Sequence, residues 1–179
     1  MASVLIPLAQ GCEELEAVTV IDLLRRAGVT VTTAGLDKQN VTASRGVVLV
    51  PDTDLDTALQ QHYDMVVLPG GLPGADHLDN DQRVRERLIG MAEAGECIAA
   101  ICAAPKVLAS TGLLKTTKAT AYPGVLEALG ITPEVTAVVE DGNIITSRGP
   151  GTAMDFALAL IEKLTGKEKR DEVEKGLVR

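Results

Sequence analysis

Hydrophobic positions along the chain alternate between short continuous runs and longer stretches in which apolar residues recur every three or four positions. The short runs are rich in Val, Ile and Leu, as in the buried strands of parallel sheets, and the longer stretches have the spacing of amphipathic helices. Strands are predicted at 3–8, 29–35, 46–51, 64–69 and 96–101, and helices at 13–28, 54–61, 81–94, 104–110 and 151–166. A smaller strand and helix are expected after residue 110. This order predicts an α/β fold with a mostly parallel sheet sandwiched by helices.

The segment 135–147 departs from this alternation. Asp141 and Gly142 lie between two β-branched runs and supply the turn of a small antiparallel hairpin. The chain has no long linker, no low-complexity tract and no clear repeat, so residues 1–179 are expected to form a single domain.

The composition indicates an aliphatic core, because 46% of residues are hydrophobic but only 2% are aromatic. A chain of this length buries roughly 70% of its unfolded surface. The net charge of -8 opposes binding to a phosphate backbone, and three aromatic residues are too few for a base-stacking platform. No apolar run approaches a membrane span, and the N-terminus lacks the basic start of a signal peptide. We therefore expect a cytoplasmic protein without a nucleic-acid or membrane partner.

The cysteines and histidines do not have the spacing of a metal site. Cys12, Cys97 and Cys102 form no Cys-x-x-Cys motif, and the two histidines, His62 and His77, are distant from all three in sequence. In a reducing compartment these are expected to be free thiols, of which most are small core residues. No metal is expected.

Cys102 lies where a strand is predicted to turn into a helix. Ala100 and Ala104, two positions to either side, leave room for the tight turn of a nucleophile elbow. In such a turn the backbone N–H of Ala103 points to where an oxyanion forms, and the helix that follows is expected to lower the pKa of the thiol. The alternative is that Cys102 is one more buried small residue.

Glu16 is the acidic residue that the helical pattern singles out. It is aligned with Val20, Leu23 and Ala27 on the inward stripe of the first helix, whereas Glu13 and Glu14 fit the pattern of ordinary acids in a first helical turn. A buried carboxyl is expected to keep its proton, and it can then donate a hydrogen bond to a thiolate or shuttle a proton to a substrate.

The loop LPGGLPGA at 68–75 is a candidate for a second oxyanion donor. Its backbone N–H groups at Gly70 and Gly71 carry no obstructing side chain. The alternative is a plain Gly-Pro turn.

These residues together resemble the ThiJ/PfpI superfamily, most closely the branch that contains the Parkinsonism-associated deglycase and the bacterial chaperone YajL. The likeness rests on six segments in the same order: GCEELEAV (11–18), DLLRRAG (22–28), ASRGV (43–47), VVLPGG (66–71), AAICAAP (99–105) and ITSRGPGTAMDFAL (145–158). The resemblance implies a flavodoxin-like fold, a homodimer, and an oxidation-sensitive cysteine at Cys102 that is hydrogen-bonded to a protonated Glu16.

The resemblance also implies roles for further residues. Gly71 and Ala103 correspond to the oxyanion-binding amides, Glu13 lines the pocket, Arg45 approaches it from the neighbouring subunit, and Pro150 lies at its wall. The implied activities are conversion of methylglyoxal or glyoxal to lactate or glycolate without a cofactor, repair of glycated protein and nucleotide, and chaperone or redox-sensing behaviour.

Two departures from the family pattern bear on the activity. Relatives in this branch carry a histidine where this chain has Tyr122, and a phenol is a poor proton shuttle at neutral pH, although Glu16 can still carry the proton. Tyr122 is either a catalytic or a packing residue. The protease-like members place a histidine after the cysteine, where this chain has Ala103, so a Cys–His pair needs His77 to fold across.

Three functions remain open from the sequence. The first is cofactor-independent conversion of a small dicarbonyl at Cys102. The second is a redox-sensing stress chaperone in which Cys102 is oxidised to a sulfinate and Cys12 acts as a resolving thiol. The third is a binding protein with a vestigial pocket.

Overall fold

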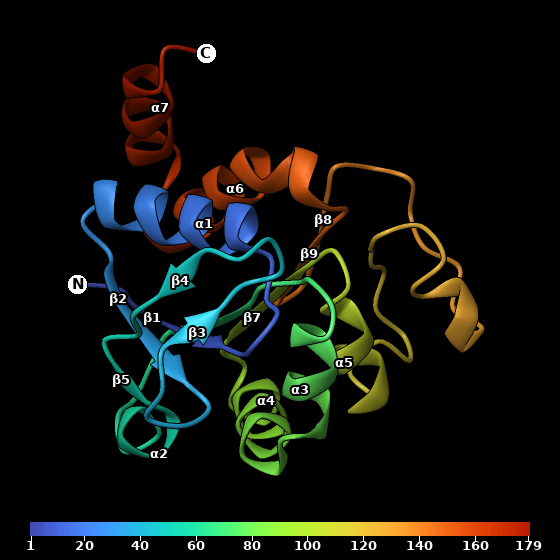
Figure 1. The fold of residues 1–179 in the computed structure, drawn as a ribbon. Coiled ribbons are helices and arrows are strands. Elements are labelled where there is room, and N and C mark those ends of the chain that lie inside the picture. The colour runs from blue at the N-terminus through green and yellow to red at the C-terminus, as the bar shows by residue number, and fades with distance from the viewer.

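Strands and helices alternate along the chain as the hydrophobic pattern predicts, in a computed structural model that describes all residues from 1 to 179 (Figure 1). Seven strands form the main sheet, in the order β5, β2, β1, β6, β7, β9, β8, and only β8 is antiparallel to its neighbour. Their bounds are β1 Ser3–Leu8, β2 Thr30–Gly35, β5 Thr53–Asp54, β6 Met65–Leu68, β7 Cys97–Ile101, β8 Val138–Asp141 and β9 Ile144–Ser147.

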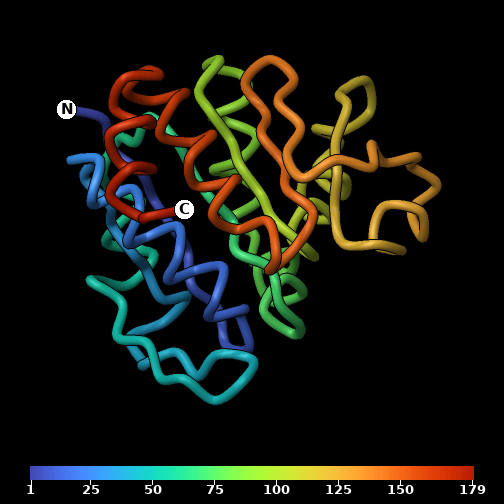
Figure 2. The backbone as a smooth tube through the Cα atoms, turned by 90° about the horizontal axis from the view of Figure 1, so that it is seen from above, coloured from blue at the N-terminus to red at the C-terminus, as the bar shows by residue number.

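Helices cover both faces of this sheet, which gives three layers (Figures 1 and 2). On one face α1 (Glu14–Arg26) packs against α6 (Ala153–Thr165), and α7 (Lys167–Gly176) packs against α6. The other face carries α2 (Leu55–Ala58), α3 (Gly74–Asn80), α4 (Gln82–Ala94) and α5 (Pro105–Ser110). The predicted α/β fold with a parallel sheet between helices is confirmed.

The strand pattern explains why the protein has two cores. Successive side chains of a strand point to opposite faces, so Val4 and Ile6 of β1 join the apolar cluster under α1 and α6, while Leu5 joins the cluster under the other helices. Continuous apolar runs such as β6 are therefore buried on both faces.

The predicted strand at 46–51 is only partly correct. Its strand part is reduced to β4 (Val48–Leu49), which pairs with β3 (Val41–Thr42) in a separate two-stranded antiparallel sheet. The sequence pattern did not reveal β5, which takes the edge position beside β2. Val48 and Val50 are exposed, so the apolar character of this run does not reflect burial in the main core.

Three other segments differ from the predictions. Helix α3 precedes the predicted 81–94 helix, and α7 follows the helix that was expected to close the chain. Between α5 and the hairpin there is a short 3-10 helix at Glu127–Leu129 and no strand. The hairpin is confirmed as β8 and β9, joined through Gly142.

The strand order places two loops side by side at the carboxyl edge of the sheet. The chain passes from β1 to β2 and β5 on one side and then crosses to β6 and β7 on the other. The loops after β1 and β6 therefore flank the point where the direction of winding reverses, which is where open α/β sheets form their sites. None of the helices is long and apolar enough to cross a bilayer.

Candidate active site

Cys102 follows β7 directly and has a left-handed backbone conformation, with φ of 63°. A residue with a β-carbon is strained in this region, by on the order of 1–3 kcal/mol. Two backbone hydrogen bonds hold it there: Cys102 N–H donates to the Ser147 carbonyl (3.0 Å), and the Cys102 carbonyl accepts from Tyr122 N–H (2.9 Å). Ala100 and Ala104 are fully buried beside the turn. The elbow predicted from the small residues is therefore present.

Glu16 lies on the inward face of α1 and is fully buried. Its Oε2 accepts a hydrogen bond from Gly70 N–H at 2.8 Å, while Oε1 has no hydrogen-bonding partner among the backbone and side-chain donors of the chain. A β-carbon on Gly70 would lie 2.6 Å from Cys102 Cβ and 2.7 Å from Glu16 Oε2. Glycine at position 70 is thus what allows the acid and the thiol to approach the same point.

The backbone amides of Gly71 and Ala103 interact with the Cys102 sulfur, and both lower the pKa of its thiol. Backbone amides that stabilise negative charge beside a nucleophile are the type of donor that an oxyanion hole uses. Gly70 was expected to be a donor of the same kind, but its N–H is used by Glu16. Gly70 therefore orients the acid, and Gly71 and Ala103 remain the candidates for oxyanion donors.

The pKa values of Glu16 and Cys102 are both raised. Burial raises the pKa of the Glu16 carboxyl to about 7, against the lowering effect of the hydrogen bond from Gly70 N–H and of the neighbouring Cys102 side chain. Burial and the negative charge of Glu16 raise the pKa of the Cys102 thiol to about 12, against the two amides. The lowered thiol pKa predicted from the sequence is wrong, because the thiol is buried and the acidic Glu16 lies beside it.

These two groups titrate as a coupled pair. The pair loses a first proton near pH 7 and keeps the second over the following pH units. Gly70 N–H stabilises a negative charge on Glu16, and the amides of Gly71 and Ala103 stabilise one on sulfur. Because the pKa of the thiol is the higher of the two, the remaining proton is held mainly by sulfur, and the Glu16 carboxylate is placed to take it when the sulfur reacts.

The loop 70–74, which we call the glycine loop, is packed tightly against the loop after β1. A β-carbon on Gly71 would lie 2.4 Å from Glu13 N, and one on Gly74 would lie 2.6 Å from Cys12 Cα. Glu13 N–H also donates to the Gly70 carbonyl at 2.9 Å. The plain-turn alternative for this loop is therefore insufficient, because its glycines are needed for the close approach that forms the site.

Glu13 and Glu14 both bind the turn at 44–47. Ser44 Oγ donates to Glu13 Oε2 (2.9 Å) and to Glu14 Oε2 (3.0 Å), and Arg45 N–H donates to Glu14 Oε1 (2.9 Å). Burial by itself would raise the pKa of the Glu14 carboxyl. The hydrogen bonds that this carboxyl accepts from the backbone and from Ser44 have the larger effect, so its pKa is lowered. Glu14 is thus a structural residue that the first-turn interpretation missed. The Arg45 side chain is exposed on this turn.

Tyr122 and Pro150 lie on the segments that hold the elbow. The Tyr122 side chain is 52% exposed, its ring is 3.3 Å from the position of a β-carbon on Gly149, and its hydroxyl makes no hydrogen bond within the chain. Its backbone N–H, by contrast, binds the Cys102 carbonyl. Pro150 begins a one-turn 3-10 helix ahead of α6 and is half-buried.

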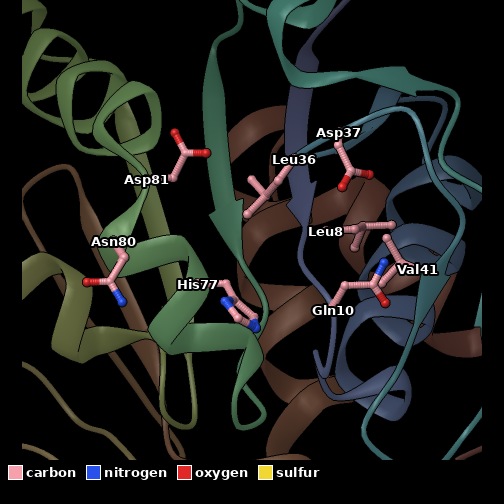
Figure 3. Close-up of a pocket in the computed structure, with 8 residues that line it drawn as sticks. All are labelled: Leu8, Gln10, Leu36, Asp37, Val41, His77, Asn80 and Asp81. Atoms are coloured by element: carbon pink, nitrogen blue, oxygen red, sulfur yellow. The ribbon is translucent and has the colours of Figure 1, made fainter.

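Neither His77 nor Cys12 pairs with Cys102. His77 points from α3 into a separate cavity of about 330 Å³, which it lines together with Leu8, Gln10 and Leu36 (Figure 3). The groups that shift the pKa of Cys102 are Glu16, Gly71 and Ala103, not His77. All three cysteines are free, and burial raises the pKa of Cys12 to about 12. No three His, Cys, Asp or Glu side chains are grouped to hold a metal ion.

The chain matches the DJ-1/PfpI family over residues 2–163. It is 46% identical to Protein dj-1beta of Drosophila melanogaster, with 98% of this chain and 96% of that protein covered. It is 34% identical to the protein of Caenorhabditis elegans named glutathione-independent glyoxalase DJR-1.2, with 98% and 95% covered. The solved structure described as Toxoplasma gondii DJ-1, oxidized, superposes with a TM-score of 0.95 at 37% identity, covering 99% of this chain and 98% of that one. The chain therefore belongs to the DJ-1/PfpI family.

Proposed function

We propose that this protein converts small α-oxoaldehydes to hydroxy acids without a cofactor, with Cys102 as the nucleophile and Glu16 as the proton carrier. Methylglyoxal would yield lactate, and glyoxal would yield glycolate. The observation that carries the proposal is the coupled Glu16–Cys102 pair at a strained turn, with the amides of Gly71 and Ala103 at its sulfur.

The reaction needs one water molecule for each aldehyde. The Cys102 sulfur adds to the aldehyde carbon as the Glu16 carboxylate takes the thiol proton, and the carbonyl oxygen becomes an alkoxide that accepts hydrogen bonds from Gly71 and Ala103 and then receives that proton from Glu16. Glu16 moves a proton from the former aldehyde carbon to the neighbouring carbon through an enediol, which leaves a thioester on Cys102. Water then cleaves the thioester, so that the hydroxy acid departs and the thiol is restored.

Four further residues have proposed roles at the edge of the site. Glu13 lines the substrate pocket, Pro150 forms part of its wall, and Arg45 approaches it from a neighbouring subunit. Tyr122 contributes its backbone N–H, which holds the elbow. We assign no proton transfer to its phenol, because the side chain is half-exposed and makes no hydrogen bond within the chain.

The named activity of a relative supports this reaction class. The Caenorhabditis elegans protein that is 34% identical to this chain is named a glutathione-independent glyoxalase. Removal of early carbonyl adducts from glycated protein would use the same thiol addition. We propose it as an additional activity of the same site.

Single substitutions at the pair test the proposed reaction. Cys102→Ser removes the thiol and Glu16→Gln removes the transferable proton, so each should abolish the conversion of methylglyoxal to lactate, measured by proton NMR. In D2O a direct transfer by the buried Glu16 should leave the substrate's own hydrogen on the carbon next to the carboxylate. Lactate formation by Cys102→Ser at the wild-type rate would contradict the proposal, and Gln82→Ala on exposed α4 is the matched control.

A redox-sensing chaperone is the second candidate function. The carboxyl proton of Glu16 and the amides of Gly71 and Ala103 could donate to the oxygens of a sulfinate formed when two peroxide molecules oxidise Cys102. The similar Toxoplasma gondii structure is described as oxidised. Intact-mass analysis after mild peroxide should add two oxygen atoms at Cys102 and none at Cys97, with a change in an aggregation assay. Absence of both turnover and selective oxidation would favour a vestigial pocket.

We also propose that the functional unit is a homodimer. The outer surface of α1 and the nearby turn and strand β4 expose several large apolar side chains, which we call the α1–β4 patch: Leu15, Val18, Val47, Val48 and Val50. Val47 N–H contacts the Glu14 carboxylate, so turn and helix form one surface. Contiguous exposed apolar residues of this kind mark interfaces. The cytoplasmic location stays a prediction from the sequence.

A further inference from the structure

A groove lined by Ala103, the residue after the reactive cysteine, has no role in the reaction described so far. It has a volume of about 350 Å³ and lies between α3, α5 and the segment around the 3-10 helix. Its apolar lining consists of Leu72, Ala103, Val125, Ala128 and Leu129. A hollow of this size is within the range of small-molecule sites.

Ala103 joins this groove to the active site. Its backbone N–H interacts with the Cys102 sulfur, and the residue also lines the groove. Leu72, which also lines the groove, directly follows Gly71, the residue with the second amide. A carbonyl group held by these two amides would thus have the groove next to its substituent.

The third wall is also fixed to the elbow. Val125 N–H donates to the Tyr122 carbonyl (3.0 Å), and Tyr122 N–H donates to the Cys102 carbonyl (2.9 Å). The groove therefore has a defined position relative to the sulfur.

The charges around the groove favour a neutral occupant. Lys106 forms an ion pair with Asp76, and Asp79 forms one with Arg85 at 2.9 Å. Each charged side chain that lines the groove therefore already has a partner of opposite charge. The surface left for a ligand is apolar, because Leu72 is 60% exposed and Leu129 is 52% exposed.

From these observations we infer that the groove binds the apolar arm of an α-oxoaldehyde whose aldehyde carbon reacts with Cys102. The inference rests on the proposed function. It names the substrate class as aldehydes with an aromatic or long alkyl substituent, such as phenylglyoxal, in preference to glyoxal. Leu72, Val125 and Leu129 are then specificity-determining residues.

Alkylation of Cys102 tests the groove independently of aldehyde turnover. N-benzyl iodoacetamide carries an apolar arm, and iodoacetamide carries none. The ratio of their rates at Cys102, followed by peptide mass analysis, should exceed the ratio at Cys97 in the same protein. Ala128→Phe fills the groove and Leu129→Glu places a charge in it, so each should reduce the Cys102 ratio roughly tenfold. Val135→Glu, an exposed substitution outside the groove, should leave it unchanged.

The possible outcomes separate the two proposals. An unchanged ratio in both groove variants overturns the inference, even if methylglyoxal is converted. A change in molar mass of Leu129→Glu by light scattering, with an unchanged ratio, would identify the groove as a protein interface and also overturn it. If wild-type protein converts no aldehyde, the proposed function fails, while the alkylation ratio still decides the groove. If turnover is present, the ratio of kcat/KM for phenylglyoxal and glyoxal should fall in the same two variants.

Discussion

At the scale of single residues, the site depends on how closely an acid from α1 and a thiol from the end of β7 approach one another. Gly70 lies between them, donates its N–H to Glu16, and leaves no room for a β-carbon. Burial of Glu16 then determines the protonation of the pair, because a carboxylate without water is costly. Packing and acid–base chemistry are therefore linked at this point.

Gly70→Ala is expected to destabilise the protein and to reduce the reactivity of Cys102. The added methyl group would overlap Cys102 Cβ and Glu16 Oε2, and overpacking of this kind costs about 1–3 kcal/mol. Gly90→Ala on α4 is the control, since a β-carbon there meets nothing within 4 Å and should stabilise the helix by roughly 0.5–1 kcal/mol. Urea unfolding measures both changes, and equal stability of the two variants would contradict the packing argument.

Glu16 should also make stability depend on pH. Its pKa is raised from 4.5 to about 7 in the folded protein, so the folded state binds more protons than the unfolded state between these values. Its contribution to the free energy of unfolding therefore falls as pH rises from about 4.5 to 7. The difference between wild type and Glu16→Gln should change by about 3 kcal/mol across this window. A difference that is constant between pH 4 and pH 8 would show that Glu16 is not buried as an acid.

At the scale of elements, the start of α1 and the turn at 44–47 stabilise one another through Glu14. Its carboxylate accepts from Ser44 Oγ and from the backbone N–H of Arg45 and Val47. The same turn carries the exposed Arg45 and leads into β4. Glu14 therefore fixes the position of a residue that is proposed to reach a neighbouring active site.

Glu14→Gln is expected to lower the free energy of unfolding by about 1–2 kcal/mol at pH 7, because a charged acceptor of several hydrogen bonds is lost. The folded pKa of Glu14 is below its ordinary value of 4.5, so its contribution is present above that value and is lost as pH falls. The difference in free energy of unfolding between wild type and Glu14→Gln should therefore become smaller at acidic pH. Glu86→Gln on exposed α4 is the control, and an equal, pH-independent effect of both substitutions would refute the role of Glu14.

The sequence was most informative where a hydrophobic pattern determines structure. The parallel strands, α1 and the elbow at Cys102 follow from apolar periodicity and small residues, and Glu16 stands out because it interrupts an apolar stripe. Helix α7 was missed because Val173 is its one buried residue, so it has no apolar stripe to detect. The roles of Gly70 and Glu14 depend on long-range hydrogen bonds, and the raised thiol pKa depends on burial, none of which is visible in local sequence.

At the scale of the whole molecule, the α1–β4 patch is an apolar surface that a single chain leaves open. Its side chains lie on α1 and beside β4, which are adjacent in Figure 1. An obligate interface on this surface would bring the 44–47 turn of one copy near α1 of the other, consistent with Arg45 entering a partner's site.

A charge placed on this patch should produce monomers. Val48→Asp is expected to lower the molar mass measured by light scattering from two chains to one, because association would bury the new carboxylate, in place of the exposed Val48, without a partner. Val135→Asp, which is also highly exposed but lies outside the patch, should remain dimeric. A wild-type protein of one chain, or a dimeric Val48→Asp, would contradict the proposed assembly.

Above about pH 7 the Glu16 carboxylate should act as the base that takes the proton of the buried Cys102 thiol as the sulfur reacts. The pH profile of iodoacetamide labelling at Cys102 tests this most directly, in wild type and in Glu16→Gln. The wild-type rate should rise through an apparent pKa of about 7, as Glu16 ionises, and then reach a plateau, and this plateau should be absent in Glu16→Gln. A wild-type rate that climbs without a plateau beyond pH 9, in parallel with the variant, would contradict it.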